Sequence, residues 1–216
     1  GSIPLILQVL IPVIAISKKQ LDLKIKGGTD VLWSPTIDYT QHVLQEAYSR
    51  MGINFSLELI KRGYYPKGGG EIKLQINPSN IKSILFSKRK TKEDKLICSF
   101  SKFTNSEIEN KVNQIVKKLT EANYIVNVEI KSEEALDSGA SLLIYSIDND
   151  SIIGIDALYN KKTDEFDLDI DDFIKNYSID DNLADMLVVP ASLATGKTIF
   201  PVKEITKHLE TNLFVT

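Results

Sequence analysis

His208 is the side chain best suited to covalent chemistry in this sequence. It lies in the segment KHLETN (207–212), with Glu204 and Glu210 nearby. A neutral imidazole, whose unperturbed pKa is about 6.5, is nucleophilic near pH 7 without a separate base. The surrounding residues favour a nucleophilic role and an orienting role for His208 equally, so both interpretations stay open on this segment alone.

The segment ATGKT (194–198) invites comparison with a phosphate-binding P-loop, G-x-x-x-x-G-K-[ST]. Gly196, Lys197 and Thr198 supply the end of that motif, but its first glycine position holds Ala191. The segment also runs from a predicted helix to a predicted strand, whereas a P-loop runs from a strand to a helix N-terminus. We therefore predict no P-loop here and interpret Gly196 as a helix C-cap.

Three further polar features favour a structural interpretation. Gln8 is a lone amide among apolar residues, and a buried amide without a hydrogen bond costs about 1 to 3 kcal/mol, so a structural hydrogen bond is favoured over a functional role. His42 has only Glu46 as an acidic neighbour one helical turn away and is interpreted as a half-buried or surface histidine. The acidic run TDEFDLDIDDF (163–173) is interpreted as a solvated face rather than a metal site.

Three consecutive glycines in RGYYPKGGGE (62–71) require a turn, a close backbone approach, or both, because glycine loses more backbone entropy on folding than any other residue. The run lies between two alternating stretches that predict strands at 54–62 and 71–77. Upstream, the pattern predicts a buried helix at 3–17, a strand at 21–28 and a helix at 37–52.

A charged stretch at 79–95 predicts a crossing into a second unit. In that unit the pattern predicts an amphipathic helix at 105–123. It also predicts four strands, at 96–103, 124–131, 140–148 and 151–159. A helix at 182–194 and strands near 197–203 and 208–216 are then predicted to return the chain to the first core.

The composition is that of a folded protein rather than of a disordered chain. The 216 residues are 43% hydrophobic and 25% charged, and the net charge of -3 excludes the globally basic field of a non-specific nucleic-acid binder. The single cysteine, Cys98, cannot form an internal disulfide, so we expect a reducing, cytoplasmic compartment. The apolar segment at 3–17 is shorter than the roughly 20 residues that span a bilayer, so we expect no membrane partner.

The segment RGYYPKGGGEI (62–72) resembles the signature of RNA 3'-terminal phosphate cyclases, with archaeal-like character. The pattern is Arg62-Gly63-x-x-Pro66 followed by the three glycines. Four other segments are similar to the same family, and together they cover nearly the whole chain, most weakly at about 80 to 160: GSIPLILQVLIPV (1–13), KIKGGTDVLWSPTIDY (24–39), NLADM (182–186) and KHLETN.

This resemblance implies an α+β fold in two domains. The large domain, residues 1–80 and 163–216, would consist of repeated units, each with two helices on a four-stranded sheet. A small thioredoxin-like α/β domain would be inserted at 81–162. We also expect the family's N-terminal repeat, whose glutamate and arginines are thought to bind metal and the RNA phosphate, to have no counterpart here.

The resemblance further implies an ATP-dependent ligase-type reaction in RNA processing. An RNA 3'-terminal phosphate would be converted to a 2',3'-cyclic phosphate through a covalent histidine–AMP intermediate on His208, releasing AMP and pyrophosphate. Magnesium, or manganese, would assist the pyrophosphate leaving group, with unknown ligands. Gln8 and Pro35 are expected to border the adenylate, opposite a wall formed by Asn182, Leu183, Ala184, Asp185 and Met186.

Two other functions stay open. The first is a catalytically inactive cyclase-like scaffold in ribosome assembly or RNA processing, although such relatives lack the nucleophilic histidine. The second is a transferase similar to enolpyruvyl transfer enzymes, which would share the repeat fold but not RGYYPKGGGE. We expect RNA 3'-phosphate ends as partners, held by a local patch of Lys61, Arg62 and Lys67. A homo-oligomer is left open.

Overall fold

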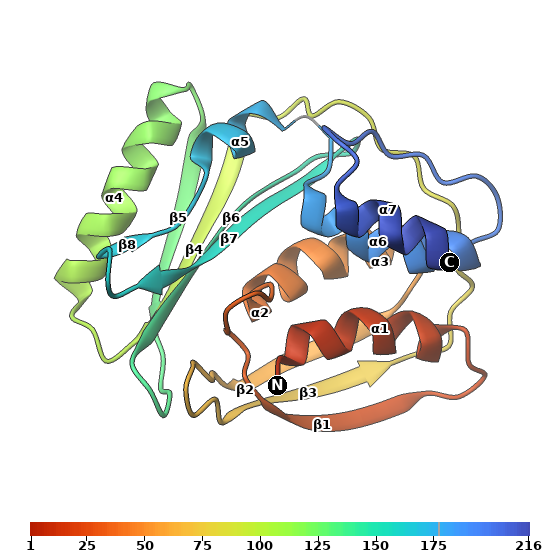
Figure 1. The fold of residues 1–216 in the computed structure, drawn as a ribbon, viewed down its shortest axis with the longest axis horizontal. Coiled ribbons are helices and arrows are strands. Elements are labelled where there is room, and N and C mark those ends of the chain that lie inside the picture. The colour runs from red at the N-terminus through yellow and green to blue at the C-terminus, as the bar shows by residue number, and fades with distance from the viewer. Residues whose placement is uncertain (177) are drawn as a thin grey trace.

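Two β-sheets enclose a layer of helices, and further helices cover the outer face of the larger sheet (Figure 1). The computed structural model describes residues 1–176 and 178–216. Buried side chains form two apolar clusters, one between the two sheets and one between the larger sheet and its outer helices. The α+β class expected from the sequence is confirmed, whereas the repeated units, the thioredoxin-like character of the second unit and the domain boundaries stay predictions.

The smaller sheet contains three antiparallel strands in the order β1-β3-β2. Their bounds are Leu21–Gly27 for β1, Phe55–Lys61 for β2 and Gly70–Ile76 for β3. Leu74 pairs with Leu23 on one side and with Leu57 on the other, so the apolar positions of all three strands share one face. The strands predicted at 21–28, 54–62 and 71–77 are confirmed.

Helix α1 (Ile3–Ala15) packs on this sheet, but it is not the fully buried helix that the sequence predicted. Leu7 and Ile11 are completely buried, while Ile6, Val9 and Val13 are 50%, 60% and 52% exposed. An apolar run whose one polar residue is Gln8 does not reveal which side of a helix meets the core, so the prediction of a buried helix was wrong for part of its surface.

One nearly continuous helix occupies the space between the two sheets. It begins after the N-cap Thr36 and comprises α2 (Ile37–Tyr39), the π-helical segment η1 (Thr40–Leu44) and α3 (Gln45–Arg50). Strand β7 (Ile152–Asn160) approaches it closely at Gly154, where a Cβ would lie 2.8 Å from Val43 Cγ2. The helix predicted at 37–52 is confirmed, and a glycine in β7 is what allows the larger sheet to pack against it.

The larger sheet has the strand order β5-β4-β6-β7-β8, with β4 and β5 parallel and the other neighbours antiparallel. The strand bounds are β4 Glu93–Ser101, β5 Ile125–Ser132, β6 Gly139–Ile147, β7 Ile152–Asn160 and β8 Glu165–Phe166. Helices α4 (Asn105–Glu121) and α5 (Ile170–Lys175) cover its outer face (Figure 1). The helix and the four strands predicted for this unit are confirmed.

The C-terminal segment differs from the sequence-based expectation. Helix α6 (Asp181–Leu193) is confirmed, but residues 208–216, expected as a strand, belong to helix α7 (Lys207–Val215). The strand expected near 197–203 is reduced to an isolated bridge between Leu85 and Ile199. Gly196 has a φ of +96° but lies two residues beyond Ala194, the actual C-cap of α6, so its interpretation as the cap was also wrong.

The glycine run forms the turn between β2 and β3. Gly68 and Gly69 have φ angles of +62° and +70°, in the left-handed region that L side chains avoid. A Cβ on Gly63 would lie 2.3 Å from the Gly70 nitrogen, and one on Gly70 would lie 2.9 Å from the Gly27 oxygen. Backbone packing therefore accounts for these glycines.

Candidate functional site

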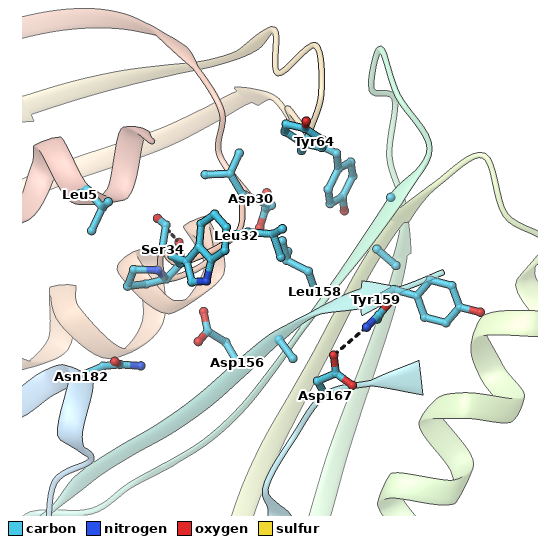
Figure 2. A pocket seen from close by; sticks show the side chains of 18 of the residues that line it. Leu5, Asp30, Leu32, Ser34, Tyr64, Asp156, Leu158, Tyr159, Asp167 and Asn182 are labelled. Atoms are coloured by element: carbon cyan, nitrogen blue, oxygen red, sulfur yellow. Dashed lines mark hydrogen bonds between the residues drawn. The ribbon is translucent and has the colours of Figure 1, made fainter. Parts of the chain in front are cut away.

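A cavity of about 1090 Å³ opens where both units of the chain meet. Its walls come from α1, the loop between β1 and α2, the turn after β2, strands β6 and β7, and helices α6 and α7 (Figure 2). Volumes of this size accommodate small-molecule ligands. Six of the eight residues expected at the site line this single cavity: Gln8, Pro35, Asn182, Asp185, Met186 and His208.

The other two expected residues lie elsewhere. Leu183 and Ala184 are 0% and 1% exposed and belong to the apolar cluster between the sheets. They are the third and fourth residues after the N-cap of α6, on the side of the helix that packs inward. On the structure they support the wall made by Asn182, Asp185 and Met186 rather than contribute side chains to it.

His208 lies in the first turn of α7, immediately after Lys207. The N-cap Thr206 fixes this turn, because its hydroxyl accepts a hydrogen bond of 3.0 Å from the Leu209 nitrogen. Leu209 is buried, while His208 is exposed and lines the cavity. A helix start, rather than a strand, therefore presents the imidazole to the cavity.

Asp185 of α6 interacts electrostatically with this histidine. Burial raises the pKa of Asp185, and attraction to His208 opposes that rise. Its Oδ1 atom is buried and has no hydrogen-bond partner among the residues that the structure describes. A buried acceptor left without a donor is costly, so a ligand donor placed beside Asp185 would be favoured.

Asp180 fixes the position of this wall relative to the larger sheet. As the N-cap of α6 it accepts hydrogen bonds of 2.9 Å from the Leu183 nitrogen, 2.7 Å from the Tyr39 hydroxyl and 2.8 Å from the Gly154 nitrogen. Burial raises the pKa of Asp180 to about 6. The Asp180 carboxylate therefore holds α6, α2 and β7 together behind the cavity.

Asp156 presents a second carboxylate to the cavity from β7 (Figure 2). It accepts a hydrogen bond of 2.5 Å from the Thr36 nitrogen, and burial raises its pKa to about 7. An acidic side chain within the otherwise apolar strand SIIGIDALY was the signal that sequence reasoning missed. Trp33, Tyr64 and Asp30 also line the cavity and were not singled out.

The raised pKa of Asp156 gives stability a defined pH dependence. The folded state holds the proton more tightly than the unfolded state, so the free energy of unfolding falls as the pH rises from about 4 to about 7. Asp156→Asn keeps the hydrogen-bond acceptor but cannot ionise. We expect this variant to match the parent near pH 4 and to exceed its stability at pH 8, by about 1.4 kcal/mol per unit of pKa shift.

Urea unfolding of both proteins at pH 5 and pH 8 would measure this difference. Asp94, whose pKa is also raised to about 6 by burial, contributes equally to both proteins and cancels in the comparison. Asp180 does not cancel fully, because its charge is one of the causes that raise the pKa of Asp156. A stability difference that does not change with pH would show that Asp156 is already ionised throughout this range.

Arg62 of the signature is not available to hold an RNA end, contrary to the sequence-based expectation. It is 2% exposed, and its guanidinium donates to Asp30 at 3.0 Å, to Asp38 at 3.1 Å and to Glu133 at 2.5 Å. Ser99 and Ser141 of the larger sheet accept its remaining hydrogen bonds. The arginine therefore connects the end of β2 with Asp30 and Asp38 of the first unit and with strands of the larger sheet in the second unit.

The part of the chain that the structure describes contains no group of three or more His, Cys, Asp or Glu side chains arranged to hold a metal ion. In the acidic run, Asp164 pairs with Lys111 at 2.5 Å and Asp172 pairs with Lys203. The interpretation of this run as a solvated face agrees with these pairs. Across the same described residues, no helix combines the length and the hydropathy needed to cross a membrane.

A model of the family described as "RNA 3'-terminal phosphate cyclase" matches residues 1–216. Among similar curated proteins, the RNA 3'-terminal phosphate cyclase of Methanosarcina barkeri is 36% identical over 222 residues, and that of Methanococcoides burtonii is 32% identical over 219 residues. The protein of the same name from Pyrobaculum neutrophilum is 30% identical over 231 residues. The alignments cover all of this chain but only 66%, 66% and 65% of these relatives.

Proposed function

This chain belongs to the RNA 3'-terminal phosphate cyclase family, and from that premise we propose that it takes part in the ATP-dependent conversion of an RNA 3'-terminal phosphate to a 2',3'-cyclic phosphate. The observation that carries the proposal is the position of His208. The histidine opens into the same cavity as five of the residues expected around an adenylate. These residues come from segments far apart in the sequence, and the fold brings them to one cavity.

The cavity fits an adenine nucleotide in size and chemistry. Leu5, Val9 and Met186 supply apolar surface for a base, and Gln8 and Asn182 supply amides. The unpartnered Asp185 Oδ1 atom is an acceptor for an amino or hydroxyl group of the nucleotide. Pro35, held next to the N-cap Thr36, borders the same space.

The chemistry proceeds by three displacements at phosphorus. A ring nitrogen of His208 attacks the α-phosphorus of ATP, the bond to the pyrophosphate oxygen breaks, and AMP is held as a phosphoramidate. An oxygen of the RNA 3'-phosphate then attacks this phosphorus and releases the imidazole. Finally, the RNA 2'-hydroxyl attacks the terminal phosphorus, loses its proton, and displaces AMP.

The described residues supply no metal-binding cluster, so no step is assigned to a protein-bound magnesium or manganese ion. A divalent ion held by the nucleotide's own phosphates would need few protein ligands, since magnesium keeps several of its waters. Any ion would then enter with the substrate.

Intact-mass measurement of the purified protein before and after incubation with ATP and magnesium tests the proposal. We expect a mass gain of one AMP, followed by its loss when an RNA oligonucleotide with a 3'-phosphate is added and a cyclic phosphate forms. An oligonucleotide with a 3'-hydroxyl is the matched control and should not discharge the protein. Absence of any AMP adduct would contradict the proposal and favour the inactive scaffold.

Several expectations stand beside this proposal without a test. They are the division into a large domain, 1–80 and 163–216, with an inserted domain at 81–162, the cytoplasmic location, and a homo-oligomer. We retain the domain division as a proposal, noting that Ile97, Leu143 and Tyr145 of the second unit pack into the first apolar cluster.

A further inference from the structure

Trp33 is the single tryptophan of the chain, and its side chain is 94% exposed at the cavity. Its φ of +59° is rare for a bulky residue and directs the indole outward at a cost in backbone strain. A large aromatic side chain held in solvent by a strained backbone has no packing role in the fold. Such positions cluster at ligand sites.

The loop around Trp33 is anchored on both sides. On one side, Asp30 is tied to the buried Arg62. On the other side, the Ser34 hydroxyl contacts the Ser2 hydroxyl at 2.5 Å, and the Thr36 nitrogen donates to Asp156. The indole is therefore presented by a fixed loop rather than by a free one, which lowers the entropy cost of stacking a planar ligand on it.

Aromatic and cationic side chains continue the cavity wall beyond this loop. Tyr65 is 70% exposed, and Lys161 and Lys162 line the cavity at the end of β7. Lys161 donates to the Ser138 hydroxyl at 2.5 Å, and Lys162 has no carboxylate partner among the described residues. Stacking surfaces next to cations are the features by which proteins bind single-stranded nucleic acid.

We propose that Trp33 is a stacking platform for a nucleobase at the 3' end of the RNA, with Lys161 and Lys162 beside the adjoining phosphates. This inference rests on the proposed function and adds the surface that receives the substrate strand. It also replaces the expected RNA-binding patch of Lys61, Arg62 and Lys67, because Arg62 is buried.

The RNA strand is favoured over ATP as the occupant because of where Trp33 lies. The residues expected around the adenylate come from α1, α6 and α7 and include Pro35 at the end of the Trp33 loop, while the lysines follow β7 at the other end of the cavity lining. In Figure 2, Leu32 and Ser34, the neighbours of Trp33 in the chain, lie between Asn182 on one side and Tyr159 on the other. The loop that carries Trp33 therefore lies between the α6 wall and the strand that leads to the lysines.

The same wall carries Asp156 and Asp167, so its charge is mixed. Stacking rather than charge should then dominate binding. Two phosphate contacts predict a slope of log affinity against log salt of about -1.4 for a single strand.

Because Trp33 is the only tryptophan, its intrinsic fluorescence reports on this position directly. Titration with a short single-stranded RNA carrying a 3'-phosphate should quench the emission, and titration with ATP alone should not. With fluorescently labelled RNA, Trp33→Leu should weaken binding by about fivefold to 150-fold, the loss of one base stack, while Trp33→Phe should retain part of it. Phe214→Leu, at an exposed aromatic side chain outside the cavity lining, is the matched control and should bind like the parent.

The outcomes separate this inference from the function on which it rests. An AMP adduct without quenching by RNA, or with unchanged affinity in Trp33→Leu, would overturn the stacking platform and leave the proposed reaction standing. Quenching by ATP but not by RNA would also overturn it and assign Trp33 to the adenylate. Quenching by RNA without an AMP adduct would support the RNA surface while contradicting the reaction.

Discussion

His208→Ala should abolish attachment of AMP to the protein, whereas His42→Ala should leave it unchanged. The chain contains only these two histidines, so the pair forms a complete test of an imidazole nucleophile. His208 lines the cavity, while His42 is half-buried and stacks on Tyr145 with ring centroids 5.3 Å apart. Burial lowers the pKa of His42, which favours its neutral imidazole, so a failure of His42 to react would reflect its position rather than its protonation state.

Intact mass after incubation with ATP and magnesium measures the effect, and a circular dichroism spectrum checks that each variant is folded. The α7 start does not depend on the imidazole, because Thr206 caps it and Leu209 anchors it. An adduct that persists in His208→Ala would mean that another group attacks ATP. Asp185 would be the first alternative, and its acyl adenylate would be hydrolysed by mild alkali, whereas a histidine phosphoramidate is stable to alkali and labile to acid.

The strands of the smaller sheet were predictable because each has one buried face. Leu23 and Ile25 alternate with charged residues in β1, and Leu57 and Leu59 do so in β2. This period of two leaves little choice of structure or of register. The amphipathic helix α4 was equally clear, with Thr104 and Glu107 forming its capping box.

The C-terminal helix was not predictable from periodicity because it has almost no buried face. Only Leu209 of α7 is buried, so no apolar stripe was available, and the apolar end near Phe214 resembled a strand. Thr206, followed by Glu210 in the first turn, was the local signal for a helix start. Contact with α6, which no local pattern encodes, completes the helix.

The site was only partly predictable for a related reason. Family-like segments pointed to Gln8, Asp185 and His208, and the fold brings all three to one cavity. Asp156 comes from the second unit, where the resemblance was weakest, and only the packing of β7 against the helical layer brings it there. Burial of an arginine, as at position 62, depends on partners distant in sequence and is invisible in a local motif.

Arg62→Met should lower the free energy of unfolding by about 3 to 5 kcal/mol, the usual cost of leaving a buried charge unpaired. Methionine keeps the apolar stem of the arginine side chain but not its guanidinium, so the loss arises mainly from the carboxylates of Asp30 and Asp38. These are 0% and 4% exposed and would retain no cation at 3.0 Å. Burial already raises the pKa of Asp30 against the opposing attraction of Arg62.

Lys73→Ala is the matched control for this prediction. Lys73 pairs with Glu58 at 3.2 Å, but both side chains are exposed, and such pairs contribute about 0 to 1 kcal/mol. Urea unfolding monitored by far-UV circular dichroism measures both variants in the same way. Equal, small losses of unfolding free energy in Arg62→Met and Lys73→Ala would show that water reaches Arg62 and its carboxylate partners in solution.

The pH dependence of the Arg62→Met variant separates lost charge pairing from lost packing. Without the arginine, the pKa of Asp30 should rise further, because only the neutral carboxyl tolerates burial. The folded variant then binds more protons than its unfolded state, so its deficit should shrink as the pH falls from 8 to 5. Asp30→Asn in the same background should recover part of the stability at pH 8, since the amide removes one unpaired charge. A deficit that is constant with pH and unchanged by Asp30→Asn would place the loss in the hydrogen bonds to Ser99, Ser141 and Glu133 instead.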